Sequence, residues 1–161
     1  MKPLLFLYSL LIMISCNQKT NNSQLQSRID SLEKKLATGY KPGLGEFMSG
    51  IQVHHAKLWF AGQNQNWELA DFEIHEIMEA LDDIQNVNTD RPEVKSIKMI
   101  NPPLDNLNKA VQNHDITSFK TNFVLLTATC NSCHQATEHG FNVIKIPDTP
   151  PFSNQEFSLK K

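Results

Sequence analysis

Residues 115–136 read DITSFKTNFVLLTATCNSCHQA, and this stretch indicates how the chain folds. Asp115 predicts the start of a helix, because an aspartate side chain accepts hydrogen bonds from the first unpaired backbone amides. Large apolar residues and cysteines then recur every three or four positions, at Ile116, Phe119, Phe123, Leu126, Cys130 and Cys133. This spacing predicts an amphipathic helix whose buried face carries both cysteines. We expect Gly140 to end the helix in a left-handed conformation.

The five residues Cys130-Asn131-Ser132-Cys133-His134 form a C-x-x-C-H motif. This is the attachment pattern of c-type haem, in which two thiols form thioethers with the vinyl groups and the histidine binds iron. The spacing suits a helix, because residues three apart share one face. A redox dithiol would lie in a thioredoxin-like strand pattern, and a zinc site would need further ligands. The sequence offers neither, so one covalent haem c is the favoured interpretation.

The first fifteen residues predict an export signal. Lys2 precedes the apolar run 4–14, which is too short to span a bilayer comfortably. Met13-Ile14-Ser15-Cys16 resembles a bacterial lipobox, which implies that residues 1–15 are a lipoprotein signal peptide and that Cys16 is lipidated. Cleavage elsewhere is the alternative, and it would leave Cys16 as an odd free thiol. Both interpretations place the domain outside the cytoplasm, and the first anchors it to a bacterial membrane through lipid.

Cysteine count and charge narrow the expected partners. The 161 residues include three cysteines, of which one is assigned to lipid and two to haem, so none is left for a disulfide. The formal net charge is −2, and no basic stripe is present, which argues against nucleic acid. Mild acidity is compatible with docking onto a basic redox partner protein, although it selects none.

A polar tether over 16–24 is expected to lead into a short helix over 25–38. Leu25, Ile29, Leu32 and Leu36 recur at heptad spacing along that helix. The run Arg28–Glu33 also resembles a short trimerisation motif, in which the arginine and the glutamate bridge neighbouring helices. Two heptads are marginal on their own. Homo-oligomerisation through residues 25–36 and a stalk that packs on the domain or on a neighbouring subunit are therefore both left open.

The chain from residue 44 onward predicts helices almost throughout, because its apolar residues recur at helical spacing without a convincing alternating run. The expected elements are a helix over about 45–61, a helix capped by Asn66, a short helix from Pro92 to Met99, and a helix over 104–113. Asn101-Pro102-Pro103 is expected to break the chain between the last two. In the second helix, an apolar stripe is expected to be buried, while the acids face away: Asp71, Glu73, Glu76 and Asp82.

Residues 44–140 resemble the cytochrome c′ family, whose members are antiparallel four-helix bundles with C-x-x-C-H near the C-terminus. The resemblance implies an all-α fold with covalent haem on the last helix. It also implies that Cys130 and Cys133 form the thioethers and that His134 is the proximal ligand. Met48 falls about where low-spin members carry a methionine bound to iron, and where high-spin members carry an apolar residue beside an open sixth site.

The chain also departs from the family pattern. Thr137 and Glu138 stand where a basic residue often follows the haem histidine. An extended, proline-containing tail over 141–161 continues past the usual end. Its six apolar side chains predict that it docks on the bundle.

The sixth iron ligand is expected to be Met48, with His55 as the alternative and an open site as a third possibility. His55 lies two turns along the same face, and two turns span roughly 11 Å, so only one of the two side chains can lie over the iron. His54 is expected to point to the surface. The other histidines and methionines are assigned to solvent, helix ends or core: His75, His114, His139, Met78 and Met99.

The sixth ligand distinguishes two possible functions of a haem protein, and a third hypothesis involves the two cysteines without haem. Methionine–histidine ligation suits outer-sphere electron transfer, because it raises the potential and limits reorganisation. An open site would make a five-coordinate protein that binds NO or CO. A thiol-disulfide oxidoreductase using Cys130 and Cys133 is a third, weaker hypothesis. No other catalytic constellation is present in the sequence, so we expect an electron carrier rather than an enzyme.

Overall fold

The computed structural model describes residues 22–159. The predicted signal peptide, Cys16 and most of the predicted tether therefore lie outside the described residues. The chain divides after Lys41 into two compact units, which are described separately. Within residues 22–159 every regular element is helical and no strand is formed, which confirms the all-α class for this part of the chain. None of the helices described there is long and apolar enough to cross a membrane.

The first unit contains a single described helix over residues 22–37. It begins three residues before Leu25, so the end of the predicted tether belongs to the helix and the predicted boundary at residue 24 is wrong. The four heptad side chains along it are all well exposed, at Leu25 54%, Ile29 46%, Leu32 57% and Leu36 75%. No other described residue of this unit covers the stripe. Self-association through it stays a prediction.

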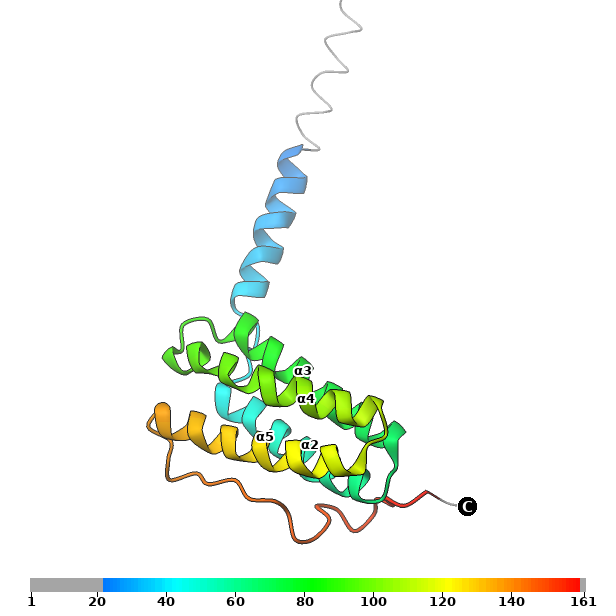
Figure 1. The fold of residues 1–161 in the computed structure, drawn as a ribbon. Helices are drawn as coiled ribbons and strands as arrows, with labels where there is room; N and C mark the ends of the chain where they lie inside the picture. Colours follow the sequence, from blue (N-terminus) through cyan, green and yellow to red (C-terminus); the bar gives the residue numbers. More distant parts are fainter. Residues whose placement is uncertain (1–21, 160–161) are drawn as a thin grey trace, which may run out of the picture. The chain divides into compact units, whose positions relative to one another are not determined.

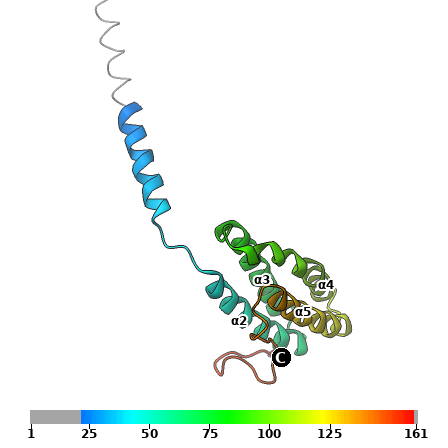
Figure 2. The same ribbon diagram turned by 90° about the vertical axis from the view of Figure 1, so that its left-hand side faces the viewer.

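The second unit contains five helical elements, drawn in Figures 1 and 2. They are α2 (Leu44–Gln63), α3 (Trp67–Val87), the 3₁₀ helix η1 (Pro92–Ile100), α4 (Asn101–Gln112) and α5 (Ile116–Ala136). α2 packs chiefly against α3, and α4 packs chiefly against α5. α5 also contacts α2 and η1. The last helix therefore packs against α2, η1 and α4.

The helix starts agree with the capping residues read from the sequence. The Asn66 side chain accepts a hydrogen bond from the Leu69 amide, and the Asp115 side chain accepts from the amides of Thr117 and Ser118. The predicted break at 101–103 is wrong, because these residues form the first turn of α4. Prolines fit there, since first-turn amides have no partner within the helix.

Three helices end in the same way, each with a non-glycine residue in the left-handed region. These residues are Gln65 with φ 55°, His114 with φ 53° and Glu138 with φ 64°. After α5, the His139 amide donates to the His134 carbonyl at 2.7 Å and the Glu138 amide donates to the Gln135 carbonyl at 3.3 Å. This pair of bonds is a Schellman motif. Gly140 is therefore not the cap, and that prediction is wrong: the two bonds hold Glu138 in this conformation without glycine.

The core is formed by apolar faces of all five elements. Phe119 and Phe123 of α5, Leu58 of α2 and Ile74 of α3 are fully buried. The predicted stripe of α3 is buried along its whole length, at Ala70, Ile74, Ile77, Leu81 and Ile84. The heptad-like pattern of the sequence therefore placed the inner face of α3 correctly.

One acid of α3 contradicts the predicted outward face. Glu73 has no exposed surface and lies against α2, where its Oε2 is 2.6 Å from His54 Nδ1 and its Oε1 is 3.1 Å from Lys57 Nζ. His54 is correspondingly only 23% exposed, so its predicted surface position is also wrong. Two basic partners offset the desolvation of the carboxylate, which is why an acid is tolerated between the two helices.

The tail after residue 140 runs along the unit and docks at some points only (Figure 1). Phe157 is 4% exposed, its ring lies 5.7 Å from that of Phe60, and its carbonyl accepts a hydrogen bond from Asn66. Phe141 and Val143, in contrast, are 84% and 72% exposed. The apolar side chains of the tail are thus divided between docking and solvent.

We predict that Gly62→Ala lowers the free energy of unfolding by about 2 kcal/mol, because overpacking a filled core forces side chains from their rotamers. A Cβ on Gly62 would come within 2.1 Å of Phe119 Cζ, and that ring is fully buried among other aromatic rings. Urea unfolding measures the change. Gly50→Ala is the control, since a Cβ there meets nothing within 4 Å. An equal effect of both substitutions would contradict this packing.

Candidate functional site

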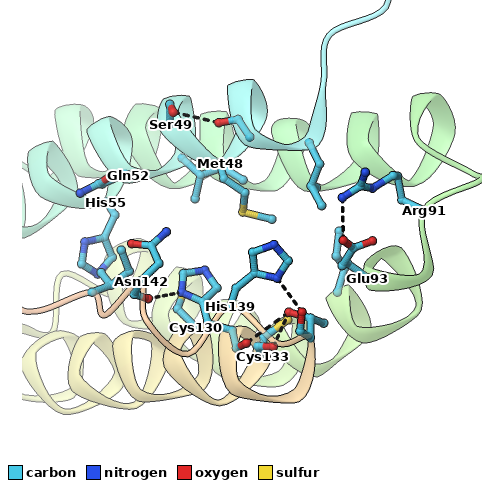
Figure 3. A pocket seen from close by; sticks show the side chains of 17 residues that line it. Met48, Ser49, Gln52, His55, Arg91, Glu93, Cys130, Cys133, His139 and Asn142 are labelled. Carbon is cyan, nitrogen blue, oxygen red and sulfur yellow. Dashed lines mark hydrogen bonds and ion pairs between the residues drawn. The ribbon is translucent and has the colours of Figure 1, made fainter.

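A cavity of about 230 Å³ lies between the first half of α2, η1 and the end of α5 (Figure 3). Its lining includes all the residues predicted to attach haem or to bind its iron, with the alternative ligand His55 among them: Met48, His55, Cys130, Cys133 and His134. A smaller adjoining cavity of about 40 Å³ shares four of these five residues and continues toward the apolar side chains of Ile77 and Leu81. The predicted site residues are therefore gathered around one largely apolar space.

The two cysteines face this space from α5 as free thiols. Cys133 is 8% exposed, and Cys130 packs against the core. Burial raises the pKa of Cys130 to about 11, with a further rise from the neighbouring Cys133, and burial also raises the pKa of Cys133. Because the thiolate is the nucleophile in disulfide exchange, these thiols are poorly suited to redox catalysis at neutral pH.

The His134 imidazole is fixed by a contact that the sequence did not reveal. Its Nδ1 lies 2.6 Å from the backbone carbonyl of Asn142. A carbonyl oxygen only accepts hydrogen bonds, so Nδ1 carries a proton, and in the neutral ring the lone pair is on Nε2. This is the tautomer in which a histidine binds a metal through Nε2 while the other nitrogen is held by an acceptor.

The side chains of Met48 and His55 differ in how available they are to bind a group in the cavity. The Met48 thioether points into the cavity from α2 (Figure 3). His55 Nε2 lies 2.9 Å from the Thr127 hydroxyl, which itself donates to the Phe123 carbonyl at 2.9 Å. The hydroxyl has only one proton, so it must accept from His55 Nε2–H. Burial lowers the pKa of His55 to about 4, which keeps the ring neutral.

Three polar side chains at the cavity, Arg91, Glu93 and His139, were not predicted from the sequence to lie there. Arg91 Nη2 lies 2.7 Å from Glu93 Oε1, and both residues line the cavity from the start of η1. The His139 ring also enters the cavity, with its Nδ1 2.6 Å from the Thr137 carbonyl (Figure 3). His139 lies at the end of α5 as predicted, but the turn at Glu138 points it inward. No spacing rule links residues 134 and 139, because five positions do not share a helical face.

The remaining histidines lie away from the cavity. His75 pairs with Asp71 on the surface, with Nδ1 and Oδ1 3.3 Å apart. His114 stacks on Trp67 with ring centroids 5.5 Å apart. Among residues 22–159, no group of three or more histidine, cysteine or acidic side chains is arranged to hold a bare metal ion.

Comparison with known proteins does not assign a function to this site. No protein-family model, no curated protein and no solved structure matches this chain. The cavity, the two free thiols and the oriented His134 are therefore the basis for a functional assignment.

We predict that protonation of His55 makes the free energy of unfolding depend on pH. An unfolded histidine titrates near pH 6.5, whereas folded His55 titrates near pH 4, so the unfolded chain binds more protons between these values. The stability present above pH 6.5 is therefore lost as the pH falls toward 4, by up to about 3 kcal/mol. Urea unfolding at several pH values measures this loss.

His55→Gln should remove this part of the pH dependence, and the exposed-site control His75→Gln should keep it. Identical pH profiles for the two variants would contradict the prediction.

Proposed function

We propose that this chain is a monohaem c-type cytochrome that carries single electrons outside the cytoplasm. The observation that carries the proposal is that Cys130, Cys133 and His134 line one largely apolar cavity while His134 Nδ1 is bound to the Asn142 carbonyl, which leaves Nε2 for a metal. The helices around the cavity suit the antiparallel four-helix bundle of the cytochrome c′ family. A lipid anchor at Cys16 would keep the domain at the bacterial membrane, within reach of redox partner proteins.

The described residues fit a covalently bound haem. Cys130 and Cys133 are free and three residues apart on one helical face, as thioether formation with two vinyl groups requires. His134 Nε2 would bind the iron, and the walls supplied by α2 and α5 would exclude water. When bound, haem supplies one-electron cycling between ferrous and ferric iron. The chain's own part is to hold the imidazole, shield the cavity and set the ligand field.

Met48 is the better candidate for the sixth ligand. Nε2 of His55 is committed to Thr127, and freeing it would leave a buried hydroxyl without its donor. The Met48 sulfur already points into the cavity, and a thioether is uncharged and easily buried. Methionine–histidine ligation supports electron transfer rather than gas binding. A five-coordinate protein that binds NO or CO is the alternative if Met48 stays unbound.

The thiol-disulfide oxidoreductase hypothesis is disfavoured by the same residues. Such enzymes lower the pKa of one cysteine through a helix N-terminus or a nearby cation. Here the motif lies in the last turns of α5, and burial raises the pKa of Cys130 instead.

We predict that protein made with cytochrome c maturation factors carries haem that resists denaturation, because two thioethers hold it. The double variant Cys130→Ala/Cys133→Ala should lose this covalent haem completely, as intact-mass spectrometry would show. The matched control is Cys16→Ala, which removes the third cysteine and should leave the haem content unchanged. A haem adduct that persists in the double variant would contradict the assignment.

We also predict that Met48→Ala converts a low-spin spectrum to a high-spin one and opens the ferrous protein to CO. Removing the thioether leaves the sixth coordination position without a protein ligand. Visible spectroscopy of the oxidised, reduced and CO-treated forms measures both changes. Met99→Ala, an equal truncation at a side chain that does not line either cavity, should leave the spectra as they are. A low-spin spectrum retained in Met48→Ala would reject Met48 as the ligand.

A further inference from the structure

The first variable position of the C-x-x-C-H motif makes a contact outside its own helix. Asn131 Nδ2 donates to the Ile144 carbonyl at 2.8 Å, and the Ile144 amide donates to Asn131 Oδ1 at 2.8 Å. One side-chain amide thus satisfies both polar groups of one residue in the tail. The geometry imitates the paired bonds that two strand residues exchange.

The same short stretch of tail also supplies the acceptor for His134. After the turn at Glu138, the Asn142 amide donates to the His139 carbonyl at 2.9 Å, which folds the chain back over the end of α5. The Asn142 carbonyl then accepts from His134 Nδ1 at 2.6 Å. Two motif residues, Asn131 and His134, therefore hold residues 142–144 at adjacent points.

The exposure of residues 141–144 shows why the contact between His134 and the Asn142 carbonyl depends on the contact between Asn131 and Ile144. Phe141 and Val143 are 84% and 72% exposed, so neither anchors the segment through apolar packing. Asn142 and Ile144 line the cavity. Ordering an extended segment costs conformational entropy, and a hydrogen bond fixes an imidazole only when its acceptor is itself held in place. On one side of the Asn142 carbonyl the chain is held by the bond from the Asn142 amide to the His139 carbonyl, and on the other side by the paired bonds from Asn131 to Ile144.

We propose that Asn131 is a positioning residue, which clamps residues 142–144 so that the Asn142 carbonyl orients the His134 imidazole. The clamp itself is independent of haem, whereas its effect on an iron ligand rests on the proposed function. An acceptor at Nδ1 makes a ligating histidine more basic and stabilises the more highly charged state of the metal. Loss of the clamp should therefore raise the reduction potential.

Three variants of the mature full chain test this proposal. Asn131→Ala removes both bonds to Ile144. Asn131→Asp keeps an acceptor for the Ile144 amide but cannot donate to the Ile144 carbonyl. Ser132→Ala is the matched control, because this other variable residue is exposed and its hydroxyl bonds only to the Ala128 carbonyl of its own helix, at 3.0 Å.

The first measurement is hydrogen exchange of the Ile144 amide in the protein as purified. We expect exchange at least about tenfold faster in Asn131→Ala, a smaller increase in Asn131→Asp, and no change in Ser132→Ala, because two bonds, one bond and none are lost. Unchanged exchange in both Asn131 variants would overturn the clamp. If Asn131→Ala does not fold, Asn131→Asp decides alone.

The second measurement follows His134 in the haem-loaded protein. The Nδ1 proton should exchange faster with solvent in Asn131→Ala than in Ser132→Ala, and the reduction potential should rise in the first variant only. A loosened Ile144 with an unchanged His134 proton and potential would overturn the positioning role. If the parent protein carries no covalent haem, the proposed function fails, and Ile144 exchange still decides whether the clamp exists.

Discussion

Burial of one face of α5 is the constraint on which the rest of the structure depends. At one end this face fills the core with Phe119 and Phe123, and at the other it presents Cys130 and Cys133 to the cavity. Because the helix is continuous between them, the packing of the two aromatic rings fixes where the sulfur atoms point. Burial of the apolar face of one continuous amphipathic helix thus orients the side chains of a chemical site.

The polar contacts near the cavity refine that orientation. His134 faces the tail carbonyl of Asn142, and His55 is held by Thr127, so each ring is restricted to one tautomer. The two histidines are thereby given different roles, since one keeps Nε2 available and the other uses it in the core. The buried Glu73 belongs to a separate contact between α2 and α3, where an ion pair with Lys57 and a hydrogen bond with His54 replace apolar packing.

The sequence predicted the elements whose signals are local. Asn66 and Asp115 cap their helices as expected, and the α3 stripe is buried as its spacing required. The errors arose where tertiary contacts override a local signal. Glu73 was predicted to face solvent with the other acids of α3, because its contacts with His54 and Lys57 of α2 cannot be read from the sequence. The cap at Glu138 needs no glycine, and the inward turn of His139 follows from that cap, so neither was visible in the spacing of residues.

Extraction of the purified parent protein with acidified acetone tests the central claim most directly. If Cys130 and Cys133 hold one haem through two thioethers, as proposed, the red pigment stays with the precipitated polypeptide. Pigment that passes into the solvent, or a colourless protein from a host able to mature c-type cytochromes, would contradict it.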